Sequence, residues 1–324
     1  MNILVTGCAG FIGYHFCIYL LKNKKNKLFG LDNLNNYYDI KLKKKRLSIL
    51  KKYKNFNFKK IDICKINTLE NYFKKSKINY VVHLAAQAGV RYSIKNPRQY
   101  MESNISGFFN ILEFSKKYNV KHLVYASTSS VYGNNKRYPL RENYETDKPI
   151  SFYAATKKSN EIMAYSYSYI YKLQTTGLRF FTVYGPYGRP DMSLFKFTKS
   201  IINSSKIDLF NNGNHERDFT YIDDVVNAIY RALVKKNTKK IPYEIYNVGS
   251  DNPIHLKKFL KIIEKNLNIK AKINFKNFQL GDIKKTHASI KKIKQHTNFK
   301  IKTSILEGVD RFIRWYKKYY NDKK

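Results

Sequence analysis

Three features are scarce in this sequence of 324 residues: cysteines, long apolar runs and acidic side chains. The three cysteines are an odd number at no metal-ligand spacing, so we expect no metal site and a reduced, cytoplasmic setting. No apolar stretch is long enough to span a membrane, and the first expected strand starts at residue 2 and breaks into glycines after five residues. We therefore expect neither membrane insertion nor a signal peptide.

The shortage of acids leaves 62 Lys and Arg against 23 Asp and Glu, a formal net charge of +39. Such an excess can indicate nucleic-acid binding. Here the charge is mostly lysine scattered over every segment, and the densest run, 41–60, contains leucines at helical spacing. We therefore expect a basic surface helix and no specific nucleic-acid partner. A positive field would still speed the association of an anionic substrate such as a sugar nucleotide.

The sequence also lacks an internal repeat and a long linker. Apolar runs at 3–5, 28–31, 56–61, 80–84 and 122–126 alternate with helical stretches. That alternation predicts an α/β fold with a doubly wound, Rossmann-type parallel sheet and ligands at the carboxyl ends of its strands. Later in the chain we expect a helix from 151 to about 172, strands over 175–184, 216–224 and 243–248, and an amphipathic helix over 303–320.

The first thirty-two residues carry the clearest functional pattern. Gly7, Gly10 and Gly13 follow the run 3–5, and residues 14–22 then have the pattern of a helix. Glycines in such a turn let a pyrophosphate approach the backbone. Asp32 lies nineteen residues beyond Gly13, close to the spacing at which a carboxylate reaches an adenosine ribose hydroxyl and would repel a 2′-phosphate. The pattern predicts NAD rather than NADP.

Other strand ends supply further candidates for the cofactor site. The full set adds Phe11, Ile12, Asn33, Asp62, Ile63, Ala85, Ala86 and Gln87 to the glycines and Asp32. For Asp62, an acid that merely starts a loop is an equally good interpretation. For His83, at the end of the fourth expected strand, we favour a structural histidine with its hydrogen bonds satisfied.

A tyrosine and a lysine on the expected helix after residue 151 suggest acid–base chemistry. Tyr153 and Lys157 are four residues apart and so share one face of a helix. A nearby ammonium stabilises a phenolate and lowers the pKa of the phenol, as a tyrosine base requires at neutral pH. This spacing is common by chance in a chain rich in both residues, and its weight comes from its position after the hydroxyl-rich stretch 127–130.

We expect two parts in the chain. Residues 1–175 should form the NAD-binding Rossmann domain, with a strand near 243–248 returning to its sheet. Residues 176–324 should mostly form a smaller α/β lobe that binds the substrate and covers the cofactor.

Taken together, these motifs resemble the extended short-chain dehydrogenase/reductase family, which contains NAD-dependent epimerases and dehydratases, over essentially the full length. Within it, the stretches 31–39, 151–157, 182–192 and 217–224 are most similar to those of the UDP-glucuronate 4-epimerases of polysaccharide biosynthesis. The stretch 286–289, Thr-His-Ala-Ser, departs from the more usual Thr-Tyr-Ala-Asp of that group.

The resemblance implies a mechanism and a set of catalytic residues. Tyr153, as phenolate, would take the proton of the sugar 4-hydroxyl while the 4-hydrogen passes to NAD as hydride. Lys157 would lower the pKa of the tyrosine and hold the nicotinamide ribose, and Thr128 would hydrogen-bond the same sugar oxygen. The 4-keto sugar would then turn over and take the hydride back on its other face.

A uronate substrate adds one physical problem. Its 4-keto form is a β-keto acid, which loses carbon dioxide when its carboxylate aligns with the ketone, so an epimerase must hold that carboxylate still. Arg189 could do so bidentately. By resemblance, the substrate-binding set is Thr128, Ser129, Ser130, Thr182, Arg189, Arg217 and Gln279, with Arg217 at the diphosphate and Gln279 on the uridine side.

Other functions remain open at this stage. A 4,6-dehydratase would need an acid pair at Ser129 and Ser130, and a UDP-glucuronate decarboxylase typically keeps a Glu where this chain has Ser130. An epimerase of a neutral or N-acetylated UDP-hexose is the main alternative, because Arg189 is the chief argument for a uronate. A silent NAD-binding scaffold is disfavoured by the presence of Tyr153, Lys157 and Thr128. Family members usually form homodimers, and we expect one here.

Overall fold

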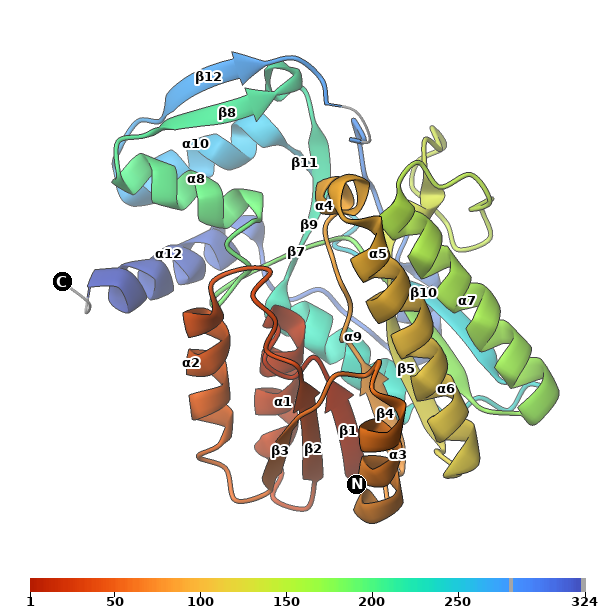
Figure 1. Cartoon of the computed structure of the whole chain (residues 1–324). Coiled ribbons are helices and arrows are strands. Elements are labelled where there is room, and N and C mark those ends of the chain that lie inside the picture. Colours follow the sequence, from red (N-terminus) through yellow and green to blue (C-terminus); the bar gives the residue numbers. More distant parts are fainter. Residues whose placement is uncertain (280–281, 322–324) are drawn as a thin grey trace.

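The computed structural model describes residues 1–279 and 282–321 and is built around a seven-stranded parallel sheet (Figure 1). Its strand order is β3-β2-β1-β4-β5-β6-β10. The strands are β1 (Asn2–Thr6), β2 (Lys27–Asp32), β3 (Phe56–Lys60), β4 (Tyr80–His83), β5 (His122–Thr128), β6 (Thr175–Phe180) and β10 (Tyr243–Val248). The order reverses beside β1, where a doubly wound sheet opens a crevice for ligands. The Rossmann-type sheet expected from the sequence is confirmed.

Helices cover both faces of this sheet. One face carries α1 (Phe11–Leu21), α2 (Ile40–Leu50), α9 (Ile222–Val234) and α11 (Lys291–Thr297); the other carries α3 (Ile66–Ser76), α6 (Gly107–Lys117) and α7 (Phe152–Tyr171). Alternate residues of a strand point to opposite faces. Ile3 and Val5 accordingly join the hydrophobic core under α1 and α9, whereas Leu4 joins the core under α3 and α6. Burial on both faces explains the short apolar runs in the central strands β1, β4 and β5.

A smaller lobe lies beyond the carboxyl ends of the central strands (Figure 1). It contains the sheet β11-β9-β7, the pair β12-β8 and three helices. These elements are β7 (Thr182–Tyr184), α8 (Ser193–Ile202), β8 (Lys206–Phe210), β9 (Glu216–Tyr221), β11 (Pro253–His255), α10 (Leu256–Leu267), β12 (Lys272–Lys276) and α12 (Ile305–Asn321). Between β4 and α6 the chain forms α4 (Val90–Lys95), α5 (Pro97–Tyr100) and a π-helical turn at Met101–Ser106.

Two expected strands were wrong in extent. The segment 175–184 forms two strands in different sheets. The first, β6, pairs with β5 up to Phe180, and the second, β7, starts at Thr182 and pairs with β9 in the smaller lobe. Local β propensity does not encode which sheet a residue joins. The expected strand 216–224 stops at Tyr221, and α9 starts at Ile222 with two acids, Asp223 and Asp224, in its first turn. Acids there interact favourably with the helix dipole.

Several elements after residue 175 belong to the central sheet. Most of β6, together with α9, β10 and α11, builds or covers that sheet, and β10 pairs with β6 in parallel. The segment 176–324 therefore contributes to both parts of the molecule. Within residues 1–279 and 282–321, no helix is long and apolar enough to cross a membrane.

Candidate active site

A cavity of about 1160 Å³ lies at the carboxyl ends of the central strands, between the two parts of the molecule. All but one of the residues expected at the cofactor and substrate sites line it. The exception is Gln279, which does not line the cavity. Its Oε1 is buried and has no hydrogen-bond partner among the residues that the structure describes. Its expected contact with uridine therefore stays a prediction.

The glycine-rich turn forms one wall of the cavity. The Gly10 N–H donates to the Gly7 carbonyl at 2.9 Å, and α1 begins at the next residue. A Cβ placed on Gly13 would lie 2.1 Å from the Gly7 carbonyl oxygen, so no larger residue fits this turn. The amino-terminal end of α1 consequently faces the cavity, and free backbone N–H groups and the helix dipole favour an anion there.

Two carboxylates stand beyond this turn in fixed positions. Asp32 accepts hydrogen bonds from the backbone N–H groups of Ala9 at 3.1 Å and Leu34 at 2.8 Å. Asp62 accepts from the side chain of Asn33 at 3.0 Å and from the Cys64 N–H at 2.9 Å. Burial alone would raise the pKa of Asp62, but these hydrogen bonds lower it. Both acids line the cavity, and backbone N–H groups fix the position of each carboxylate.

Tyr153 and Lys157 lie in the first turns of α7, whose amino terminus is capped by the Ser151 hydroxyl accepting from the Ala154 N–H. Burial raises the pKa of Tyr153, while a hydrogen bond with Thr128 and the charge of Arg189 lower it. Burial lowers the pKa of Lys157 to about 7, and the carboxylate of Glu161 partly offsets this shift. The groups that favour a phenolate are therefore Thr128 and Arg189, and an effect of Lys157 on Tyr153 stays a prediction.

A buried ion pair supports this part of α7 and was missed by the sequence reasoning. Glu161 accepts from Nε and Nη2 of Arg179, both at 2.8 Å, and from the Ser127 hydroxyl at 2.6 Å. The side chains of Arg179 and Glu161 are only 4% and 3% exposed. The pair ties α7 to the carboxyl ends of β5 and β6, and the sequence gives no local signal for it.

The part of the cavity around Thr128 is rich in hydroxyl groups. Thr128 begins a tight turn, Ser129–Tyr132, in which its Oγ1 accepts from the Ser130 N–H at 3.2 Å. Ser129, Ser130 and Thr182 also line the cavity. On the smaller lobe, Arg217 donates to Asp282 at 2.8 Å. His83 lies outside this lining, buried and bonded to the Thr6 hydroxyl at 2.9 Å, as a structural histidine would be.

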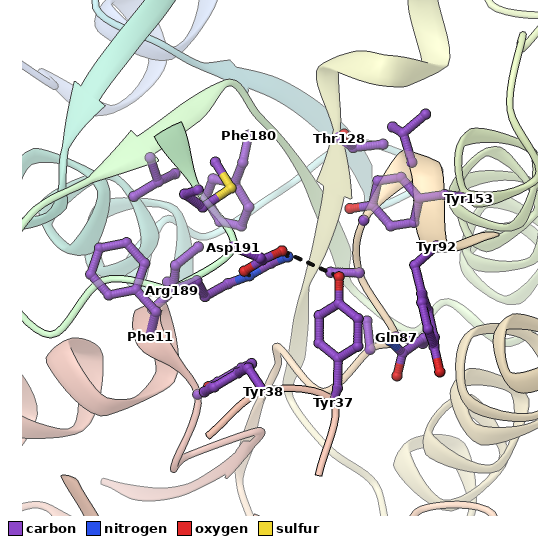
Figure 2. Close-up of a pocket in the computed structure, with 18 of the residues that line it drawn as sticks. Phe11, Tyr37, Tyr38, Gln87, Tyr92, Thr128, Tyr153, Phe180, Arg189 and Asp191 are labelled. Atoms are coloured by element: carbon purple, nitrogen blue, oxygen red, sulfur yellow. Dashed lines mark hydrogen bonds and ion pairs between the residues drawn. The ribbon is translucent and has the colours of Figure 1, made fainter. Parts of the chain in front are cut away.

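Arg189 lies opposite Tyr153 and Thr128 in Figure 2 and does not stand alone. Its Nε donates to Oδ1 of Asp191 at 3.0 Å, and its Nη2 donates to Oδ2. The Tyr37 hydroxyl also donates to Oδ2 of Asp191, at 3.2 Å. Burial would raise the pKa of Asp191, but the charge and hydrogen bonds of Arg189 hold it below the usual value. The arginine is thus half of a neutral pair in this structure.

Several other lining residues were not singled out from the sequence. They are Tyr37, Tyr38, Lys43, Arg91, Asp191, Met192, Lys196, Phe210, His215 and Asp282. Four of these residues lie in two stretches on which the family resemblance rests, 31–39 and 182–192. The sequence therefore indicated that these stretches belong to the site, but it did not indicate the contacts that their side chains make.

The lining fits a dinucleotide. Lys157 is 1% exposed and lines the cavity, and within the described residues no hydrogen bond or ion pair reaches its Nζ, so this buried amine could still hydrogen-bond a ligand. The helix terminus at Phe11 suits a pyrophosphate, and Asp32 stands where a ribose hydroxyl could donate to it. These groups span one continuous cavity.

Comparisons with known proteins agree with this geometry. The model of the NAD dependent epimerase/dehydratase family matches residues 3–249. The UDP-glucuronate 4-epimerase of Thermodesulfobacterium geofontis is 46% identical, with 97% of this chain and 95% of that protein aligned. UDP-glucuronate 4-epimerase 4 of Arabidopsis thaliana is 44% identical over 100% of this chain and 77% of its own. The structure of UDP-glucuronic acid 4-epimerase from Bacillus cereus with UDP-glucuronic acid and NAD superposes with a TM-score of 0.93 at 33% identity, covering 99% and 100% of the two chains.

Proposed function

Because the chain belongs to the NAD dependent epimerase/dehydratase family, we propose that it is an isomerase that interconverts UDP-glucuronate and UDP-galacturonate through a transient 4-keto sugar. One observation carries this proposal. The same cavity holds the Tyr153 and Thr128 hydroxyls, which can serve as base and hydrogen-bond donor, and the guanidinium of Arg189 on the opposite side. Relatives at more than 40% identity that carry this name support the choice of substrate.

Each residue has one task in the proposed reaction. NAD held by these residues would supply the acceptor for the 4-hydrogen as hydride and the donor for its return to the other face of the sugar. Tyr153 takes the proton of the 4-hydroxyl and gives it back after the keto sugar has turned over. Thr128 hydrogen-bonds the same oxygen. The glycine turn with Phe11 and Ile12 holds the pyrophosphate.

We assign the remaining contacts to residues that line the cavity and, for the uridine, to Gln279 beyond the lining. Asp32 and Asn33 bind the adenosine ribose, Lys157 binds the nicotinamide ribose, and Asp62, Ile63, Ala85, Ala86 and Gln87 enclose the dinucleotide between them. Ser129, Ser130, Thr182 and Arg189 hold the sugar and its carboxylate. Arg217 neutralises the diphosphate, and Gln279 lies toward the uridine.

A neutral or N-acetylated UDP-hexose is the second candidate substrate. The observation in its favour is the ion pair between Arg189 and Asp191, which leaves no net charge at that point to attract a carboxylate. Decarboxylation of UDP-glucuronate is less favoured, because Ser130 lies where the decarboxylases typically have a Glu.

We also propose a cytoplasmic homodimer that acts in polysaccharide biosynthesis, without a nucleic-acid partner. Its NAD-binding part comprises residues 1–175 with β10, and its substrate lobe most of 176–324. The outer surfaces of α6 and α7 support the dimer, since they expose Phe109, Phe152, Ile162, Tyr165 and Tyr169, an apolar set of the kind that pairs helices between subunits.

The test is to incubate the purified protein with UDP-glucuronate, without added NAD, and to separate the products by anion exchange. UDP-galacturonate in the mixture is the expected result and would also show that NAD co-purifies. Carbon dioxide with a UDP-pentose as main products would contradict the proposal in favour of decarboxylation. If neither appears even with NAD supplied, while UDP-glucose or UDP-N-acetylglucosamine is epimerised, the neutral-hexose alternative is correct. The Tyr153→Phe variant is the control for chemistry at the proposed base.

A further inference from the structure

The pairing of Arg189 with Asp191 leaves part of the guanidinium group unused. An arginine has five N–H donors, and Asp191 takes one from Nε and one from Nη2 on the side-on edge. The end-on edge, formed by Nη1 and the second N–H of Nη2, is not engaged by this aspartate. One guanidinium can therefore hold two carboxylates at once, each on its own edge.

Asp191 is itself held from a different part of the chain. Tyr37, in the loop between β2 and α2, donates its hydroxyl to Oδ2 of Asp191, and the Arg189 guanidinium lies 5.8 Å from the Tyr37 ring centroid. The Tyr37 hydroxyl in turn fills the space at Gly89, where a Cβ would lie 2.6 Å from it. The side chains of Arg189 and Asp191 are 21% and 29% exposed, so the pair forms part of the cavity wall. A long side chain in an irregular loop thus has its rotation restricted from two sides.

We propose that Asp191 is a positioning residue that fixes Arg189 side-on, so that the end-on edge holds the substrate carboxylate in one orientation and suppresses decarboxylation of the 4-keto sugar. This inference rests on the proposed function and adds a residue to it. Tyr37 completes the arrangement by orienting Asp191 (Figure 2).

The reaction to be suppressed has a defined geometry. In the 4-keto uronate the C5–C6 bond breaks, its electron pair becomes the C4–C5 double bond of an enolate, and carbon dioxide leaves. A proton then adds to C5 and gives a UDP-4-keto-pentose. The bond breaks readily only when it lies parallel to the π orbitals of the ketone, which requires the carboxylate to stand axial on the sugar ring. A carboxylate held near the ring plane is therefore protected. A guanidinium that can swing on its flexible stem would not keep the carboxylate from moving to the axial position.

The experiment compares product partition in the full-length protein with NAD supplied. UDP-glucuronate labelled with ¹³C at the carboxyl carbon is turned over, and labelled carbon dioxide and UDP-galacturonate are quantified in the same sample. For Asp191→Asn we expect the ratio of carbon dioxide to epimer to rise about tenfold, the factor for one lost charge-assisted hydrogen bond. Tyr37→Phe should raise the ratio in the same direction and by less.

A matched control exists on α12. Asp310 accepts a hydrogen bond from Nε of Arg314 at 3.1 Å and forms an ion pair with its Nη2 at 2.9 Å, again side-on, and neither residue lines the cavity. Asp310→Asn should leave the ratio at the wild-type value. Retained binding of NAD by the Asp191 and Tyr37 variants, measured by fluorescence, shows that each is folded.

The outcomes separate this inference from the proposed function. If the wild-type protein epimerises UDP-glucuronate and Asp191→Asn keeps the wild-type ratio, the inference is overturned and the function stands. If Asp191→Asn instead lowers KM with an unchanged ratio, Asp191 is a competing anion that the substrate displaces, which also overturns the inference. If the wild-type protein does not turn over UDP-glucuronate at all, both fail.

Discussion

Replacing Glu161 by glutamine should test the buried ion pair beneath the candidate active site. The substitution keeps the size of the side chain and removes the charge that faces Arg179, whose own side chain is only 4% exposed. It also disturbs three hydrogen bonds at once, two from Arg179 and one from Ser127. Because a buried guanidinium without a counter-charge costs about 3–5 kcal/mol, we expect a loss of that size in the free energy of unfolding.

Urea denaturation followed by circular dichroism measures this loss. The control is Glu307→Gln, because Glu307 pairs with Arg311 one helical turn away and both side chains are 45% exposed. That change should cost less than about 1 kcal/mol. The double variant Glu161→Leu with Arg179→Met replaces both charges by apolar groups and should recover most of the stability. A loss below about 1 kcal/mol for Glu161→Gln would refute the reasoning that this pair is a buried, coupled unit.

Three further predictions address the active site and the core. Thr128→Val removes the hydrogen bond that lowers the pKa of Tyr153, so the rise of kcat/KM with pH should move to higher pH; an unshifted pH profile would contradict this. Gly13→Ala places a methyl group against the Gly7 carbonyl and should abolish co-purification of NAD, measured by absorbance of the released dinucleotide, and NAD retained at wild-type levels would refute it. Burial lowers the pKa of His83 to about 3 and of His122 to about 4, below the ordinary 6.5 of an unfolded chain. The unfolded state therefore binds more protons as the pH falls below 6.5, so thermal stability should fall between pH 6.5 and 4, and a constant Tm over that window would contradict the assignment.

The order of elements in the NAD-binding part could be predicted from the sequence because strands buried on both faces are apolar runs. The runs 3–5, 28–31 and 122–126 each lie within one observed strand. The glycine turn before α1 and the shared helix face of Tyr153 and Lys157 could also be predicted, because each depends only on residues within one turn or one helix.

What could not be predicted depends on contacts between distant segments. Asp191 is only two residues from Arg189 in the sequence, but its place on the side-on edge depends on the irregular backbone after β7 and on Tyr37 from a distant loop. The hydrogen bond from Arg217 to Asp282 likewise joins residues that are far apart in the sequence. The division of 175–184 between two sheets depends on tertiary pairing, which local propensity does not contain.

The passage of the chain between the two parts has a consequence for how this enzyme could change its specificity. The chain leaves the central sheet between Phe180 and Thr182, returns between β9 and α9 at Tyr221 and Ile222, and leaves again between β10 and β11. No single cut separates the smaller lobe from the central sheet, so the lobe cannot be exchanged as one contiguous segment in the way that tethered domains are shuffled. A change of substrate would therefore require single substitutions in the cavity wall. The NAD-binding part would keep its structure, because the same connections join it to the lobe.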